Sequence, residues 1–136
     1  MDEKKPIFGR VSEEQYQGPT TREHLYSQLE DELGVPIISF FTSFIYPVMI
    51  EDSDSDMLEG VLQECDLSEG FALVLSSPGG SALAAERIIN ICRSYSGIGL
   101  YKAIVPSKAK SAATMICLGA SELIMGKTSE LGSIDP

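Results

Sequence analysis

Two short stretches of the sequence combine residue types that could perform acyl chemistry. The first is a Ser-Ser-Pro-Gly-Gly turn ending at Gly79 and Gly80, and the second is Ser111, which opens a run of small and apolar residues. Glycines adopt backbone conformations closed to other residues, so amide groups of this turn can point outward at the start of the next helix. Such amides suit a developing oxyanion, and a serine hydroxyl can act as a nucleophile. Together the two stretches predict an oxyanion hole and a nucleophile.

Each stretch also has a purely structural interpretation. The Pro-Gly-Gly turn can be a tight connection between a strand and a helix, and Ser111 can be an N-cap residue bonded to its own helix. The local pattern alone favours the N-cap interpretation of Ser111. A serine nucleophile also needs a base, and a lysine serves only if its pKa is lowered, for example by burial. Lys108, Lys110 and Lys127 lie in polar turns, so none of them is a convincing base.

Strands and helices alternate along the sequence in a way that brings both stretches to one edge of a parallel sheet. Strands are expected over 36–44, 71–76, 100–105 and 122–125, and helices over 22–33, 54–65, 81–95 and 111–119. In open α/β folds, sites form at the carboxyl ends of the strands, where both turns lie. The sequence therefore predicts an α/β domain over residues 35–136, preceded by an N-terminal arm and helix over residues 1–34.

The helical patterns also predict which side chains pack inward. These are Met57, Leu58, Val61 and Leu62 in one helix and Leu83, Ile88, Ile91 and Cys92 in the next. In the helix over 22–33, Thr21 is the expected cap and Gly34 the expected end. His24 is the only histidine and lies on the first turn of that helix, where a surface position is expected.

Composition and charge exclude several classes of protein. The chain has 136 residues, which is about one domain, and a formal net charge of -10, which argues against nucleic acid and anionic membrane surfaces as main partners. No apolar run approaches the roughly 18 residues that a membrane span needs, and the acidic residues over 51–59 are expected to form a solvated segment. The three cysteines are widely spaced and predict reduced thiols, hence a cytoplasmic protein. No metal or cofactor is predicted.

The order of these motifs is similar to that of a known fold. The SSPGG turn with its helix, the later serine helix, a strand and a Gly-x-Ile turn resemble the Clp-protease/crotonase fold. The stretch KSAATMICLGASELIMGKTSELGSIDP resembles the serine dehydrogenase proteinase family, relatives of signal peptide peptidase A. That family has a Ser-Ala-(Gly/Ala)-Thr motif, an Ala-Asp-Glu-Ile-like strand and a Leu-Gly-Pro-(Ile/Val)-Asp-Pro ending. The resemblance covers 71–136, is weaker over 35–70 and implies a ββα-type spiral with a mainly parallel sheet.

The resemblance implies a serine peptidase in which Ser111 is the nucleophile. The amides of Gly79 or Gly80 and of Ala112 would form the oxyanion hole. The glycines and an extended segment after them would hold a peptide or protein substrate as an added strand, and a homo-oligomer is implied as well. The sequence departs from the family at Ser121, Lys127 and Ser133.

The general base is the least defined part of the predicted site. Asp135 falls near the position of the Clp-protease histidine, and relatives with a Ser-Lys dyad carry their lysine further downstream. The chain is therefore expected to be truncated at its C-terminus, with Lys127, Lys110 and Asp135 as the possible base or auxiliary groups. Without an adjacent base, the chain alone is expected to hydrolyse peptides poorly.

Three functions remain open at the level of sequence. The favoured one is a serine peptidase of Ser-Lys type. A non-catalytic oligomeric scaffold of the same fold is the main alternative. A crotonase-type acyl-CoA enzyme is a third, with Glu86 and Asp135 as its only obvious carboxylates, and the serine at the helix start argues against it.

Overall fold

The computed structural model describes residues 19–134 and divides after Gly34 into two units, which are described separately. The first unit contains helix α2 (Pro19–Leu33). Gly34 ends it with a φ of +71°, and its N–H donates to the Glu30 carbonyl over 2.7 Å. Thr21 lies inside the helix, so the predicted cap is wrong, whereas His24 is exposed as expected. The predicted arm lies outside the described residues.

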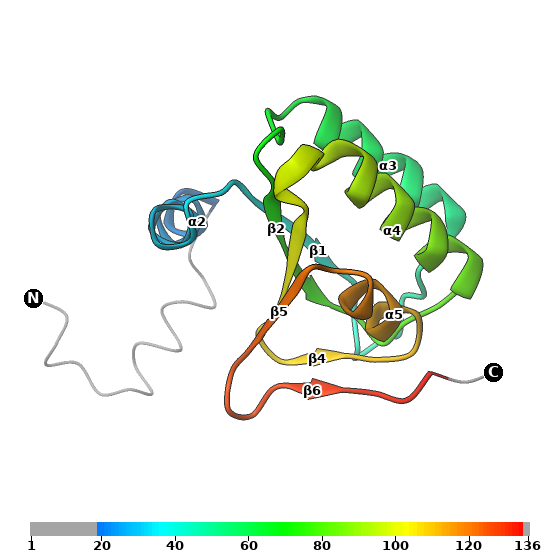
Figure 1. Ribbon diagram of the computed structural model, residues 1–136. Helices are drawn as coiled ribbons and strands as arrows, with labels where there is room; N and C mark the ends of the chain where they lie inside the picture. Colours follow the sequence, from blue (N-terminus) through cyan, green and yellow to red (C-terminus); the bar gives the residue numbers. More distant parts are fainter. Residues whose placement is uncertain (1–18, 135–136) are drawn as a thin grey trace, which may run out of the picture. The chain divides into compact units, whose positions relative to one another are not determined.

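The second unit is built on a four-stranded sheet in which every strand pair is parallel. Its strands are β1 (Ile37–Phe41), β2 (Phe71–Ser76), β3 (Tyr101–Val105) and β5 (Glu122–Met125), in the order β1-β2-β3-β5. The helices are α3 (Asp52–Gln63), α4 (Ala82–Tyr95) and α5 (Ala112–Leu118), and a 3-10 turn, η2, spans Gly97–Gly99. Figure 1 shows α3 and α4 side by side. The predicted α/β fold with a mainly parallel sheet is confirmed.

The core lies between the sheet and its helices. Alternate side chains of the central strands point into it, and Leu58, Leu62, Ile88, Ile91 and Cys92 meet them from α3 and α4. Phe71 of β2 stacks on Tyr101 of β3 with the ring centroids 5.9 Å apart. Each fully buried side chain of this size contributes about 1.5–3 kcal/mol to folding. The stacked pair joins the amino ends of β2 and β3, and the buried side chains of Leu75 and Val105 anchor their carboxyl ends, where both predicted turns begin.

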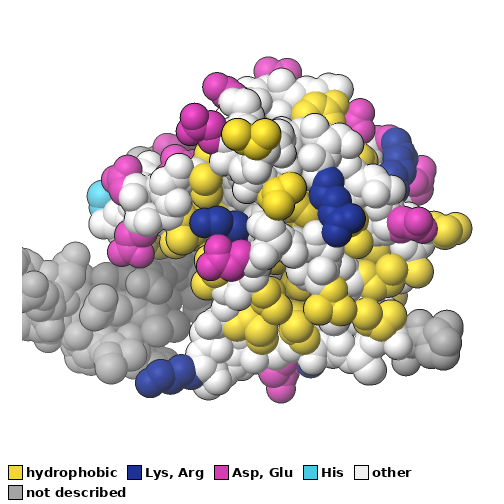
Figure 2. Space-filling model, in the orientation of Figure 1, with side chains coloured by type: hydrophobic (Ala, Val, Ile, Leu, Met, Phe, Trp, Pro, Cys, Tyr) yellow, Lys and Arg dark blue, Asp and Glu magenta, His cyan; other side chains and the backbone are white. Residues whose placement is uncertain are grey.

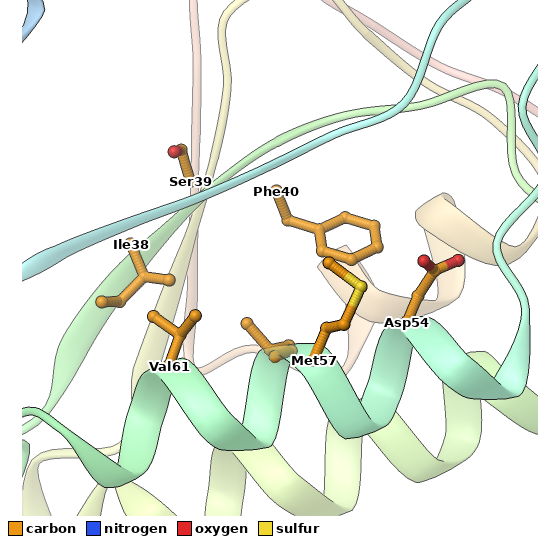
Figure 3. Close-up of a pocket in the computed structure, with 7 residues that line it drawn as sticks. Ile38, Ser39, Phe40, Asp54, Met57 and Val61 are labelled. Carbon is orange, nitrogen blue, oxygen red and sulfur yellow. The ribbon is translucent and has the colours of Figure 1, made fainter. Parts of the chain in front are cut away.

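Three side chains predicted to be in the core are exposed instead. Leu83 is 78% exposed because it lies on the outer side of α4, whereas Ala84 and Ala85 in the same turn are buried. Met57 and Val61 are 70% and 49% exposed. They line an open pocket between α3 and β1, facing Ile38 and Phe40 of β1 (Figure 3). Because β1 is the edge strand, that side of α3 borders solvent.

Helix α3 also begins earlier than predicted. A helix over 54–65 was predicted, whereas α3 begins at Asp52 and its N-cap is Glu51. The Glu51 N–H donates to the Asp54 carboxylate over 2.8 Å, which satisfies a backbone donor at the helix start. Arg87 of α4 pairs with Asp52 over 3.0 Å and also with Asp56. The acidic segment is therefore largely helical and linked to α4.

A second, smaller sheet was not predicted. Strands β4 (Lys108–Ala109) and β6 (Glu130–Leu131) pair in parallel, in addition to the four strands predicted from the sequence. The two strands run side by side near α5 (Figure 1). Figure 2 shows hydrophobic side chains gathered on the lower part of the same face, in the region where Figure 1 places α5 and this sheet. The small sheet ties the chain before Ser111 to a segment much later in the sequence.

Candidate functional site

The glycine turn is held in place from several sides. Beyond β2, the Ser77 N–H donates to the Lys108 carbonyl over 3.2 Å, and the Ser77 carbonyl accepts from the Lys110 N–H over 3.0 Å. The Gly79 carbonyl accepts from the Ile50 N–H over 2.8 Å. The turn therefore connects β2 directly to the segment that leads to Ser111.

Gly79 lies in direct contact with that segment. Its φ is +109°, a region that residues with side chains rarely adopt. A Cβ atom at this position would lie 2.6 Å from the Lys110 carbonyl oxygen, 2.6 Å from the Ser111 Cβ and 3.1 Å from the Ala112 nitrogen. The structure thus brings Gly79 and Ser111 together at one edge of the sheet, and only glycine fits between them.

Ser111 occupies the N-cap position of α5 in a strained conformation. Its φ of 54° and ψ of -121° lie outside the regions that non-glycine residues favour. Its hydroxyl makes no capping bond and no other hydrogen bond to the described residues. Ser111 therefore stands at the N-cap position, but the interpretation that its side chain caps its own helix is wrong. A conformation of this kind costs on the order of 1–3 kcal/mol and is most often found at functional sites.

The structure distinguishes between the two glycines as hydrogen-bond donors. The Gly79 N–H donates to the Ser77 Oγ over 3.0 Å and is therefore occupied. Neither the Gly80 N–H nor the Ala112 N–H donates to any described residue. Of the predicted hole residues, Gly80 and Ala112 keep free donors, and Gly79 shapes the turn instead.

The extended segment that was expected after Gly80 is absent from the described residues. Helix α4 begins at Ala82, and its N-cap Ser81 accepts from the Ala84 N–H over 3.2 Å. The Ser81 N–H donates to the Ile50 carbonyl over 2.9 Å. This backbone is thus paired with Ile50 through the Gly79 carbonyl and the Ser81 N–H, whereas the Gly80 N–H is left free. The pairing of a peptide strand with this turn stays a prediction.

None of the described residues proposed as the base bonds to the Ser111 hydroxyl. The Lys110 ammonium lies 3.5 Å from the Glu130 carboxylate, and Lys127 is exposed in the turn after β5. The Lys108 ammonium lies 5.9 Å from the centre of the Phe44 ring. Asp135 lies outside the described residues, and Glu86 is exposed on α4. Over residues 22–134 no side chain bonds to the Ser111 hydroxyl.

Two residues that support the site were not singled out from the sequence. Thr114 is buried, and its hydroxyl lies 3.0 Å from both the Ala109 and the Gly132 carbonyl oxygens. It therefore joins α5 to β4 and to the end of β6. Ser77 is the second such residue. Both occur inside the motifs noted in the sequence, Ser-Ala-Ala-Thr and Ser-Ser-Pro-Gly-Gly, which was the available signal.

Burial separates the three cysteines, all of which are free thiols. Cys65 is exposed, whereas Cys92 and Cys117 are buried. Burial raises the pKa of Cys92 to about 12 and that of Cys117 to about 11.

Among the described residues, no group of three or more His, Cys, Asp or Glu side chains could hold a metal ion. Within the same part of the chain, no helix is long and apolar enough to cross a membrane.

Comparison of the sequence with known families gives a match over residues 20–136 to the ClpP-like SDH-type serine proteinases. Two curated relatives are the uncharacterized proteins MJ1495 and MJ0137 of Methanocaldococcus jannaschii. The first is 34% identical over 104 residues and the second 31% identical over 103 residues. Each alignment covers 76% of this chain and 32% of the relative. The chain thus spans about a third of the length of these relatives.

Solved structures with a similar fold include ClpP1 from Listeria monocytogenes. That structure, of a mutant, has a TM-score of 0.52 at 16% identity, over 68% of this chain and 51% of that chain. The 1510-N membrane-bound stomatin-specific protease has a TM-score of 0.57 in two mutants. The serine-to-alanine mutant is 20% identical, over 74% of this chain and 47% of that chain. The lysine-to-alanine mutant, in complex with a substrate peptide, is 22% identical, over 74% of this chain and 44% of that chain. At these identities the similarity shows a ClpP-like fold.

Proposed function

Because the chain belongs to the family of ClpP-like SDH-type serine proteinases, we propose that it carries the nucleophile of a serine peptidase, Ser111. The observation that supports this most directly is the strained, uncapped Ser111 in contact with the glycine turn. An N-cap serine would bond to its own helix and would not need such a backbone conformation. Strain of this size persists where the surrounding structure enforces it, as the backbone bonds between Ser77, Lys108 and Lys110 do here.

The proposed reaction proceeds through an acyl-enzyme. The Ser111 Oγ attacks the carbonyl carbon of a peptide bond and gives its proton to a base. The free N–H groups of Gly80 and Ala112 donate to the oxygen that becomes negatively charged. The tetrahedral intermediate collapses, the C–N bond breaks, and the protonated base gives its proton to the leaving amine. Water then hydrolyses the ester and restores the serine.

We further propose that this peptidase is of the Ser-Lys type. Lys110 is engaged with Glu130 and Lys127 is exposed, so neither is assigned the role of base. A base must lie within hydrogen-bond reach of the Ser111 hydroxyl to accept its proton, and neither ammonium bonds to it. We therefore assign the base to a lysine beyond residues 22–134, supplied by the same protein or by a partner copy. The 136-residue chain alone is then expected to turn over peptides slowly.

Partners and location are part of the same proposal. One similar structure is of a protease with a bound substrate peptide, which supports a peptide or protein substrate for this chain. We propose a homo-oligomer and a cytoplasmic location; the three free cysteines suit a reducing compartment. No observation favours a crotonase-type enzyme, because Glu86 is exposed on α4.

A fluorophosphonate probe tests the proposed nucleophile. Wild-type protein is incubated with the probe, and the modified residue is identified by peptide mass spectrometry. We expect the label on Ser111, its loss in Ser111→Ala and its retention in Ser107→Ala, which removes an exposed hydroxyl before β4. The same comparison with a fluorogenic peptide reports turnover. Equal labelling of wild type and Ser111→Ala, with no turnover, would instead favour the non-catalytic scaffold.

A further inference from the structure

Ser77 is a fully buried serine that bonds to several parts of the candidate site. Its Oγ accepts from the Gly79 N–H over 3.0 Å and lies 2.6 Å from the Thr42 Oγ1. Its backbone bonds to Lys108 and Lys110, on the segment that leads to Ser111. One residue thus joins β2, the end of β1, the glycine turn and the chain before the proposed nucleophile.

We propose that Ser77 is a positioning residue for the oxyanion hole. It holds the Gly79 N–H inside the protein, so that the next amide, that of Gly80, is the one left free in the turn that contacts Ser111 through Gly79. The inference rests on the proposed function, and it adds a residue that neither contacts the substrate nor takes part in the chemistry.

The two glycines need such a restraint. Their φ values are +109° and +155°, and glycine has little intrinsic preference that would hold either conformation. The Gly79 N–H is buried with its residue, so it requires an acceptor, and the Ser77 hydroxyl provides one. A hydroxyl has two acceptor lone pairs and one proton. Ser77 can therefore accept from Gly79 and also share a hydrogen bond with Thr42.

Loss of this restraint should appear as a loss of catalysis more than of binding. In Ser77→Ala the Gly79 N–H has no acceptor, and rotation of the turn takes the Gly80 N–H away from the oxyanion position. Removal of one hole donor in other proteases lowers kcat by about 100- to 1,000-fold. Partial misplacement of a backbone donor should cost less, on the order of 10- to 100-fold in kcat. The KM for a peptide should change by less than about threefold, because the substrate is bound before the oxyanion forms.

The test compares wild type, Ser77→Ala and Thr42→Val in the full-length protein, with Ser94→Ala as an exposed-serine control. We measure kcat and KM for a fluorogenic peptide and the affinity for a peptide boronic acid, whose tetrahedral adduct occupies the hole. Amide hydrogen exchange of Gly79 is followed by NMR, and far-UV circular dichroism reports folding. We expect faster Gly79 exchange, a lower kcat and weaker boronate binding in Ser77→Ala. Thr42→Val, which keeps the shape and the Ser77 hydroxyl, should show a smaller loss in the same direction.

Several outcomes would overturn the proposal. The first is an unchanged kcat in Ser77→Ala, and the second is an unchanged rate of Gly79 amide exchange. The third is a fall in kcat and KM that correlates only with the melting temperature across the variants. If Ser77→Ala does not fold, Thr42→Val carries the same test, and a wild-type kcat in that variant counts against the role. A wild-type protein with neither turnover nor boronate binding contradicts the proposed function itself, whereas an active wild type with a fully active Ser77→Ala contradicts only the role of Ser77.

Discussion

Gly79→Ala is the substitution for which the structure gives the clearest prediction. A methyl group at this position would lie 2.6 Å from the Lys110 carbonyl oxygen and 2.6 Å from the Ser111 Cβ. Real contacts at these distances do not occur, so the backbone on one side must move. In addition, the φ of +109° is one that alanine rarely adopts.

The expected loss of stability follows from two contributions. Backbone strain at such a φ costs on the order of 1–3 kcal/mol, and an extra methyl group in a tightly packed region costs about 1–3 kcal/mol. Their sum, about 2–6 kcal/mol, is a large part of the 5–15 kcal/mol that is typical of a domain. We therefore expect a partly unfolded or strongly destabilised variant, with the proposed peptidase activity lost because Ser111 is displaced.

Urea unfolding followed by far-UV circular dichroism measures this loss, and Gly60→Ala is the matched control. Gly60 lies inside α3, and no atom lies within 4 Å of the place its methyl group would occupy, so alanine should stabilise the helix by about 0.5–1 kcal/mol. The unfolding midpoint should fall in Gly79→Ala and rise in Gly60→Ala. A free energy of unfolding of Gly79→Ala within about 0.5 kcal/mol of wild type, with Gly60→Ala behaving as expected, would refute the close contact between the glycine turn and Ser111.

Three further predictions concern the proposed nucleophile Ser111, the buried Thr114 and the cysteines. Ser111→Gly should raise the free energy of unfolding by about 1 kcal/mol, because glycine relieves the strained φ of this residue. Ser111→Ala should leave the free energy of unfolding almost unchanged. Equal stability of the two variants in urea would argue against strain at Ser111. Thr114→Val should lower stability by about 1–3 kcal/mol, because the hydrogen bond that the buried hydroxyl donates to the Ala109 or the Gly132 carbonyl is lost, although the Ala109 carbonyl still accepts from the Gly132 N–H. An unchanged melting temperature would contradict this. Native protein at pH 8 should take up one iodoacetamide, at Cys65. Burial raises the pKa of the two buried thiols in the folded state to about 11 and about 12. Their contribution to stability is therefore complete below pH 9.0 and is lost as the pH rises toward these values. Melting temperatures between pH 8 and 11 measure this decline.

The central elements could be predicted because their residues leave little choice. Strand β2 is almost entirely apolar, as a strand covered on both faces must be, and β5 was predicted at its observed bounds. The wrong predictions of burial concern side chains whose exposure depends on the neighbouring elements of the fold. Met57 and Val61 follow the helical pattern of a core face, but the edge position of β1 leaves them open. The spacing of apolar residues in one helix cannot show which strand forms the edge of the sheet beside it.

The candidate site was predictable in its residue types but not in its geometry. Ser111 and the two glycines stand out by motif, whereas the φ of Ser111 results from bonds made by its neighbours. The division of roles between Gly79 and Gly80 depends on the Ser77 hydroxyl, a residue type too common to single out. Strands β4 and β6 have two residues each and exist only through their pairing. Such short partners have no periodicity of their own.

The parallel arrangement of the sheet has a consequence for how the protein folds. Each strand of the main sheet pairs with a partner that is separated from it in sequence by a helix, so no strand pair can form as a hairpin. The contact between Gly79 and Ser111 requires the second crossover to be closed, and a high proportion of non-local contacts slows folding to milliseconds or longer. We expect the site to assemble late. In stopped-flow refolding, substitutions around α5 should mainly speed unfolding, while truncation of buried side chains in β2 should slow folding.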